Sequence, residues 1–543
     1  MGRPSFSSPN VGEVPSAARR RGKWYLKART TVPACAAFGF ALLSAASCTV
    51  GPDFKRPAPP PEKQLTATPL PTATSSAQSK DGEAQRFVAG EDIPAQWWSL
   101  FHSPALAVLI AQALKSNPDL QSAKAALRVA REDVYAQQAV YFPTIGANLN
   151  ASRNLNSTVL SPTLFSYQPY FNLYSAELSA NWTLDVWGGN RRAVESLKAS
   201  QDAQHYQVVA ARLTLTSALA AAAIQEASLR GQMDATEIIV KDESQSLDIL
   251  NRQLSLGQES GADVALQETA LAQARQSLPP LQKQLAQERD LIAALAGRFP
   301  ADQLPQTFQL DALELPRELP LSIPAKLVDQ RPDVRTAEAN LHAASAGVGV
   351  SIANELPNIS LSASDGTIAT GVSSLFTPGS AYWSVAGGLT QTLFDGGALL
   401  HKTRAAGAAY DQALAQYRST VLSAFRNVAD TLEAIRSDAD SLGAAAAAQD
   451  AAARSLKSRQ LRLKLGDVSV LAVLAAEQAY EQAEIALVQA RASRLADSVA
   501  LFEALGGGWW NQQAPARKLS ATGDGTKAGP TADGQAPTQQ ALP

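Results

Sequence analysis

The 543-residue chain has few of the side chains that build metal centres and disulfide frameworks. It contains four His, two Cys and two Met residues. Zinc sites need clusters of Cys and His, and soft metals need thioethers, so we expect no metal site and no cofactor. Charged residues make up 18% of the chain and hydrophobic residues 45%, which argues against gross disorder. No apolar run after the N-terminal region reaches the ~18 residues that predict a transmembrane helix.

Positive charge is scarce outside the N-terminal region. Seven of the 47 Lys and Arg residues and one of the 49 Asp and Glu residues lie before position 48, so 40 basic and 48 acidic residues follow it. This balance argues against nucleic acid as the main partner. The four His residues lie far apart and form no HExxH pattern. With no other catalytic motif standing out, we predict that the chain is not an enzyme.

The N-terminal region has the order of an export signal. A basic segment, Arg19 to Arg29, precedes the apolar stretch TVPACAAFGFALLSAAS and then Cys48. This predicts a signal peptide over residues 1–47. The run ASC resembles the lipobox of bacterial lipoproteins, which predicts a covalent lipid, including palmitate, on Cys48. The alternative is a plain signal peptide with an incidental Cys48. Since Cys35 is lost with the signal, the mature chain would contain no intrachain disulfide.

Two segments have the composition of unstructured chain. Residues 48–90 include RPAPPPEKQLTATPLPTATSS, which is rich in Pro, Thr and Ser, and we predict an extended, lipid-anchored tether there. Residues 511–543 are rich in Gly, Thr, Gln and Pro, and we predict a disordered tail.

The region between these segments is duplicated. NPDLQSAKAALRVA from Asn117 matches RPDVRTAEANLHAA from Arg331, and LSLGQES from Leu254 matches LKLGDVS from Leu463. The repeat is roughly 210 residues long. We place the first repeat at 91–297, a Pro-rich linker at 298–330 and the second repeat at 331–510. Each repeat reads helix, strand, strand, long helix, turn, long helix.

The predicted long helices are rich in strong helix formers. The segment from Arg191 to Ser255 contains no Pro and abundant Ala, Leu, Gln and Glu, and its length would span roughly 100 Å as a helix. Small residues along it favour close, coiled-coil-like packing. The four long helices are predicted at 191–255, 258–297, 398–465 and 470–505.

The predicted strands alternate between apolar and polar residues. They cover 144–152, 172–187, 358–369 and 381–394. In the second strand Leu178, Ala180 and Trp182 alternate with Glu177 and Asn181. Such segments of ~10 residues are typical of transmembrane β-barrels, and the alternative is an ordinary half-buried antiparallel sheet.

Together with the export signal, the alternation favours the barrel. We predict that Leu178, Ala180 and Trp182 face lipid and that Glu177 and Asn181 face the lumen. Because known barrels have at least ~8 strands, four strands cannot close one, and the barrel must be shared between chains.

A carboxylate follows the second strand of each repeat. Asp185 precedes Trp187-Gly188-Gly189, and Asp395 precedes Gly396-Gly397. Paired carboxylates are the catalytic groups of glycosidases. Their repeat-related positions at strand-to-helix junctions instead predict helix N-terminal capping.

Taken together, these segments resemble the TolC-like outer-membrane efflux channels, specifically the OprM/NodT lipoprotein branch. The matching runs extend from residue 48 to about residue 507: CTVGPDFKRP, QWWSLFHSPALAVLIAQALKSNPDL, LPPLQKQLA, RPDVRTAEANLHAA and LFDGG. The resemblance implies an α+β membrane protein that assembles as a homotrimer. Each chain would give four strands to a 12-stranded outer-membrane β-barrel, continuous with a long periplasmic α-helical barrel. The linker and terminal segments would form an equatorial belt.

The resemblance also implies a function. The trimer would be the outer-membrane exit duct of a tripartite efflux pump, which passes drugs or other small solutes to the exterior. Its partners would be a periplasmic adaptor (membrane fusion) protein, an inner-membrane RND-type transporter and outer-membrane lipid. Two alternatives remain: a type I protein-secretion duct, and a non-pore coiled-coil envelope lipoprotein, which would have no use for the alternating strands.

In this family the helical hairpin turns carry the periplasmic entrance. Here Gly257 and Gly466 mark these turns. Members of the family often have acidic residues six and nine positions after the second of these glycines, where this chain has Ala. Asp263 and Asp467 are the remaining candidates for an acidic entrance. The alternative is that both are solvated turn residues or helix caps.

Overall fold

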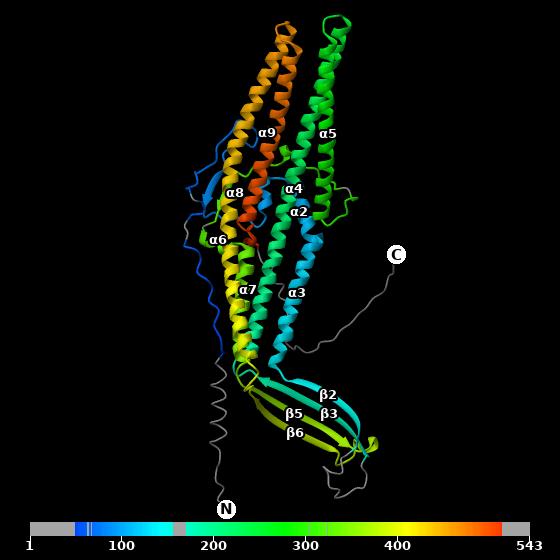
Figure 1. Cartoon of the computed structure of the whole chain (residues 1–543), viewed down its shortest axis with the longest axis vertical. Coiled ribbons are helices and arrows are strands. Elements are labelled where there is room, and N and C mark those ends of the chain that lie inside the picture. The colour runs from blue at the N-terminus through cyan, green and yellow to red at the C-terminus, as the bar shows by residue number, and fades with distance from the viewer. Residues whose placement is uncertain are drawn as a thin grey trace, which may run out of the picture. The chain divides into compact units, whose positions relative to one another are not determined.

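A computed structural model gives the fold of the chain (Figure 1). The structure describes residues 49–512 except 62, 63, 67, 156–169, 303 and 323. The chain divides into two units, Met1–Cys48 and Thr49–Pro543. The predicted signal peptide and the lipidation site Cys48 lie outside the described residues, as does most of the predicted tail.

Two helical hairpins, one in each repeat, form the largest part of the second unit. The first consists of α4 (Gly189–Ser255) and α5 (Gly261–Leu295), and the second of α8 (Ala398–Lys464) and α9 (Val470–Ala504) (Figure 1). In both hairpins the first helix has 67 residues and the second has 35. The duplication of the sequence therefore extends to the lengths of the helices.

Shorter helices precede the strands of each repeat. They are α2 (Pro104–Ser116) and α3 (Pro118–Gln138) in the first repeat, and α6 (Pro324–Gln330) and α7 (Pro332–Ala353) in the second. Each begins with Pro, which loses no hydrogen bond at the first helical position. Asn117 caps α3, because its side-chain oxygen accepts a hydrogen bond from the Leu120 amide at 2.9 Å.

The second helix of each hairpin is the shorter one and ends beside the start of another helix: α5 ends beside α3, and α9 ends beside α7. At the end of α5, the Asn117 side-chain amide donates to the Leu295 carbonyl at 3.0 Å. At the end of α9, Arg331 donates to the Ala504 carbonyl at 2.8 Å. Gly297 permits the first junction, since a Cβ there would lie 2.6 Å from the Ser116 carbonyl oxygen. Along the part of α4 and α8 nearest the strands, neighbouring helices therefore follow the order α3-α4-α7-α8. Along the part nearest the hairpin turns, the order is α5-α4-α9-α8 (Figure 1).

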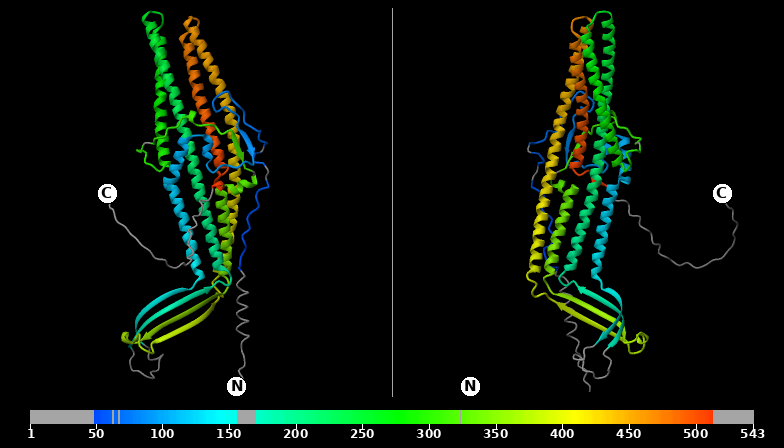
Figure 2. Two further views of the ribbon diagram at one scale, coloured as in Figure 1. Left: turned by 180° about the vertical axis from the view of Figure 1, so that it is seen from behind. Right: turned by 45° about the vertical axis from the view of Figure 1, so that its right-hand side comes forward.

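Four antiparallel strands form a single sheet in the order β2-β3-β5-β6. In both views of Figure 2 this sheet lies at the end of α4 and α8 opposite to the hairpin turns. The strands are β2 (Thr144–Leu155), β3 (Tyr170–Leu184), β5 (Asn358–Ala369) and β6 (Ala381–Thr390). Two strands end earlier than predicted: β3 ends at Leu184 and β6 at Thr390, where the predicted last residues were 187 and 394. The residues after each strand turn the chain into the next helix.

The segment predicted as an extended tether is partly folded. Within it, β1 (Arg86–Ala89) pairs in parallel with β4 (Glu318–Leu321) of the predicted linker. Arg494 of α9, whose exposed fraction is 0%, donates to the carbonyls of Asp81 at 2.8 Å and Glu83 at 2.6 Å. The prediction was wrong for this part of the segment, because a side chain from another element satisfies its backbone.

The main hydrophobic core lies where the two hairpins meet the shorter helices. Trp97 stacks on Phe502 of α9, with 5.5 Å between ring centroids. The core also includes a stretch of α4 that is apolar enough to cross a membrane by length and composition alone, contrary to the expectation from the sequence. Leu219, Ala223 and Ile224 of this stretch are buried against other helices, which explains its apolar character as core packing.

Candidate functional site

One face of the four-stranded sheet is mostly apolar in every strand, and its charged residues are Arg153 of β2 and Asp365 of β5, which lies between Leu178 and Trp383. Ala180 of β3 lies opposite Ile145 of β2 and Ala363 of β5, and Trp182 lies opposite Leu361. Monomeric soluble proteins rarely expose a large contiguous apolar patch. The exposed apolar side chains on this face are Ile145, Leu149, Leu155, Tyr170, Leu178, Trp182, Leu361, Trp383, Val385 and Leu389.

The other face of the sheet carries polar groups that bond to one another. The Tyr382 hydroxyl of β6 donates to the Glu177 carboxylate of β3 at 2.9 Å. This bond crosses over Gly366 of β5, where a Cβ would lie 2.5 Å from the Ala176 carbonyl oxygen. Asn181 of the same face accepts a bond at its carbonyl from the Thr144 hydroxyl at 3.2 Å.

The register thus puts the two predicted sets of residues on opposite faces. Leu178, Ala180 and Trp182 share the apolar face, and Glu177 and Asn181 share the polar face. That the apolar face meets lipid and the polar face meets a lumen stays a prediction.

Both carboxylates at the strand-to-helix junctions cap helices, as the sequence predicts. Asp185 accepts hydrogen bonds from the amides of Asn190 at 2.9 Å and Arg191 at 3.0 Å, at the start of α4. Asp395 accepts from the amides of Gly397 at 2.8 Å and Leu399 at 2.7 Å, at the start of α8. The bond from Leu399 is the main reason why the pKa of Asp395 is lowered. Each carboxylate therefore caps the helix that follows it.

The two hairpin turns share one backbone geometry. Gly257 and Gly466 have φ values of 69° and 74°, which favour glycine. At the first turn the Gly257 amide donates to the Leu254 carbonyl and the Gln258 amide to the Gln253 carbonyl. The second turn repeats this pattern, which is the Schellman motif that ends many helices.

Both candidate entrance carboxylates have partners within their own turns. Ser260 caps α5, because its hydroxyl accepts from the Asp263 amide at 3.3 Å and donates to the Asp263 carboxylate. Asp467 accepts from Arg462 Nε at 2.9 Å. Asp263 therefore has a capping role and Asp467 a paired cation. An acidic entrance formed by these residues stays a prediction.

A cluster of carboxylates between the two hairpins has no signal in the sequence. Glu243 of α4 is buried and accepts from the side-chain amide of Gln267 of α5. Nearby on α9, burial raises the pKa of Glu477 and of Glu481 to about 7 in each case. Glu477 also lines a cavity of about 340 Å³ with Gln267 and residues of both hairpins. The packing of α4 against α9 brings together Glu243 and Glu477, which are 234 positions apart in the sequence (477 − 243).

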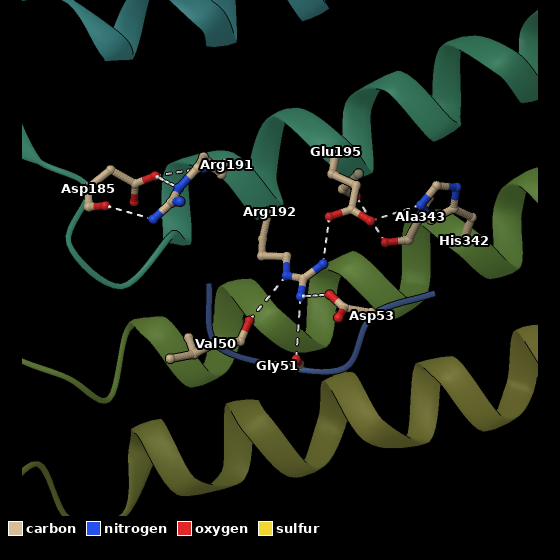
Figure 3. A network of polar contacts seen from close by, with 10 residues as sticks. Val50, Gly51, Asp53, Asp185, Arg191, Arg192, Glu195, His342 and Ala343 are labelled. Atoms are coloured by element: carbon tan, nitrogen blue, oxygen red, sulfur yellow. Dashed lines mark hydrogen bonds and ion pairs between the residues drawn. The ribbon is translucent and has the colours of Figure 1, made fainter. Parts of the chain in front are cut away.

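The residues that follow Cys48 are held at the junction of β3 and α4 (Figure 3). Arg192, near the start of α4, has a side chain that is 4% exposed. It donates to the carbonyl of Val50 at 3.1 Å and to the carboxylate of Asp53 at 2.6 Å. It also donates to Glu195 at 2.8 Å, and Glu195 in turn contacts His342 of α7 at 2.9 Å.

Comparison with known proteins gives a family match over most of the chain. The model of a family described as "Outer membrane efflux protein" matches residues 109–298 and 323–507, one segment in each repeat. The chain is 32% identical over 432 residues to the pyoverdine export outer membrane protein OpmQ of Pseudomonas aeruginosa, covering 78% of this chain and 90% of that protein. It is 29% identical over 477 residues to the probable efflux pump outer membrane protein TtgC of Pseudomonas putida, covering 87% and 95%.

Solved structures of outer-membrane channels have the same fold. The outer-membrane channel OprN superposes with a TM-score of 0.77 at 27% identity, covering 85% of this chain and all of that one. The open state of the MtrE outer membrane channel of Neisseria gonorrhoeae gives a TM-score of 0.73 at 25% identity, covering 85% and 99%. The resemblance found in the sequence is therefore confirmed, and the chain belongs to the outer membrane efflux protein family.

Proposed function

We propose that three copies of this chain close into one outer-membrane channel, with a 12-stranded β-barrel formed by four strands from each copy. The helices would continue it as a periplasmic α-helical barrel. The observation that supports this assembly is the identical order of strands and helices. Because α3 leads into β2 and β6 leads into α8, the two edge strands of the sheet are continuous with the two outermost helices of the order α3-α4-α7-α8.

The outermost strands are available for pairing between copies. Among the described residues, β2 and β6 each pair along one side alone. Open strand edges are not tolerated in a bilayer, because their backbone groups would lack partners. Pairing β2 of one copy with β6 of the next uses two different surfaces, and such a head-to-tail contact closes a ring when the rotation between copies is a whole fraction of a turn.

The channel serves outer-membrane efflux, and we propose that it is the exit duct of a tripartite pump. Its partners would be a periplasmic adaptor protein and an inner-membrane RND-type transporter, which would select the drug or solute. The named relatives support efflux of small solutes over type I protein secretion, since one exports pyoverdine and another is a toluene efflux pump component. The exposed apolar face of the sheet argues against a non-pore coiled-coil lipoprotein.

We also propose that Cys48 carries the lipid anchor of the mature protein. The basic and apolar segments that end at this residue support the proposal. Intact-mass measurement of the mature N-terminus should show an acylated Cys48 as residue one. An unmodified N-terminus at another residue would refute it.

A proline at the outer edge of β6 tests the assembly. The Ile368 amide donates to the Ser380 carbonyl, and paired and unpaired positions alternate along antiparallel strands. The amide of Val385 therefore points away from β5. Proline is tolerated on an edge strand at such a position, so Val385→Pro should leave the protomer's own sheet paired but remove a bond between copies.

We expect Val385→Pro to lower the yield of heat-resistant trimers and of conducting channels in planar bilayers. Val385→Thr, which keeps the amide and the branched side chain, is the matched control and should assemble normally. Val385→Pro trimers with native heat resistance and conductance would refute pairing of copies along this edge.

A further inference from the structure

The segment that follows Cys48 binds a fixed site on the folded chain. Arg192 donates to the carbonyls of Val50 at 3.1 Å and Gly51 at 3.4 Å, and to the carboxylate of Asp53 at 2.6 Å (Figure 3). The Val50 amide completes the docking by donating to the Trp187 carbonyl at 3.0 Å. Thus backbone and side-chain groups of Val50, Gly51 and Asp53 are bonded to the junction of β3 and α4.

The fit of this segment depends on close backbone contacts. A Cβ at Gly51, whose φ is 89°, would lie 2.4 Å from the Cα of Gly349 on α7. On the other side, a Cβ at Gly188 would lie 2.7 Å from Thr49. Glycines at both points allow the segment to lie between α4 and α7, and a larger residue would displace it.

A second set of contacts fixes the end of the segment. The Phe54 ring stacks on the His342 ring, with 4.3 Å between centroids and 14° between planes. His342 contacts Glu195, which also accepts from Arg192 at 2.8 Å. One buried guanidinium therefore links the segment, α4 and α7. Arginine suits this place because its rigid fork can bond carbonyls and carboxylates at once, which a lysine cannot reproduce.

The site lies where the membrane-facing strands end. β3 ends at Leu184, and Thr49 contacts Gly188 just beyond it. Cys48 is bonded directly to Thr49, and consecutive Cα atoms are about 3.8 Å apart. A lipid on Cys48 would therefore start at the base of the protomer's own strands, not at the end of a free tether.

We propose that Arg192 is the positioning residue for the lipid anchor. It seats the mature N-terminus so that the acyl chains enter the bilayer beside β3, and the lipid then guides insertion of the sheet at that point. This inference rests on the proposed lipidation of Cys48. A lipid on an unseated segment would tether the protein to the membrane without orienting its strands.

The seating can be measured directly with a spin label. Once Cys48 is acylated and Cys35 is removed with the signal peptide, Pro52→Cys provides a unique thiol on an exposed residue between Gly51 and Asp53. The label should be immobile in the parent protein and mobile in Arg192→Gln and in Asp53→Asn, which changes the segment alone. Arg418→Gln, an exposed arginine of α8, is the control and should leave the label immobile. An immobile label in both test variants would overturn the proposal.

The effect on insertion separates positioning from a merely structural role. We would follow insertion into phosphatidylethanolamine and phosphatidylglycerol vesicles for lipidated protein and for Cys48→Ala exported with an ordinary signal peptide. Arg192→Gln and Asp53→Asn should slow insertion about 5-fold in the lipidated protein, as expected for loss of a charge-assisted bond, and should not slow the Cys48→Ala protein.

Equal slowing in both backgrounds would overturn the proposal, because Arg192 would then act on folding and not through the lipid. An unmodified Cys48 in the mass spectrum would overturn it as well. Failure of the proposed duct is a separate result, since it would appear as absent conductance in planar bilayers for trimers of every variant, including the parent.

Discussion

A charge placed on the apolar face of the sheet should destabilise the membrane-inserted protein by a predictable amount. Ala180 lies four residues before the end of β3 at Leu184, which is roughly 14 Å along the strand. With a strand tilt of about 45°, this is roughly 10 Å along the membrane normal. The apolar band of such barrels is about 25 Å tall, which places Ala180 near its midplane. Ala180→Arg should therefore cost about 2–4 kcal/mol of folding free energy.

The neighbouring position provides the control. Asn181→Arg adds the same side chain one residue away, on the face where Asn181 lies opposite Thr144 and Ser362. This variant should insert normally and change single-channel conductance, because its charge would lie in the lumen. Urea titration of vesicle-inserted trimers would give the unfolding free energies, and planar bilayers would give the conductance. Equal losses of stability in the two variants would refute the assignment of the faces.

Two further predictions concern the hairpins. Asp263→Ala combined with Asp467→Ala should lower the cation preference of the channel and weaken its block by multivalent cations. Of the two single variants, Asp263→Ala should have the larger effect, because Arg462 already pairs with Asp467. Unchanged ion selectivity in trimers that assemble normally would favour capping roles alone. Burial raises the pKa of Glu477 and Glu481 from 4.5 to about 7, so the native state holds more protons than the unfolded chain between these values. The free energy of unfolding should therefore fall as pH rises from about 4.5 to 7, and Glu477→Gln with Glu481→Gln should flatten this dependence in thermal melts; a native slope in that variant would contradict the assignment.

Local periodicity was sufficient to predict the elements that define the channel. The third strand of the sheet begins and ends at the predicted residues, Asn358 and Ala369, and its first half shows a clear alternation of Ile359, Leu361 and Ala363 with serine residues. Strand ends were harder to place. Alternation continues past Leu184 in the sequence, but Asp185 bonds to the first turn of α4 and takes the chain out of the sheet. Side-chain capping therefore decided a boundary that the apolar pattern could not.

Contacts between distant residues had no local signal. Glu243 and Glu477 lie on helices of different repeats, and neither belongs to a recognisable motif in the sequence. The same holds for Arg494 of α9, which bonds to residues near position 83. Periodicity reports which face of a helix is buried, but it does not report which polar side chain on that face meets a particular partner.

The N-terminal segment shows why composition alone misjudged part of the chain. A stretch rich in Pro, Ser and Thr cannot build a core of its own, but it can bind a surface that already exists. Arg192 donates to the carbonyls of Val50 and Gly51, and Arg494 donates to those of Asp81 and Glu83. Both arginines are buried, so the backbone of the segment supplies acceptors that their guanidinium groups would otherwise lack. The segment and the helices therefore stabilise each other, which cannot be predicted from the sequence of either part alone.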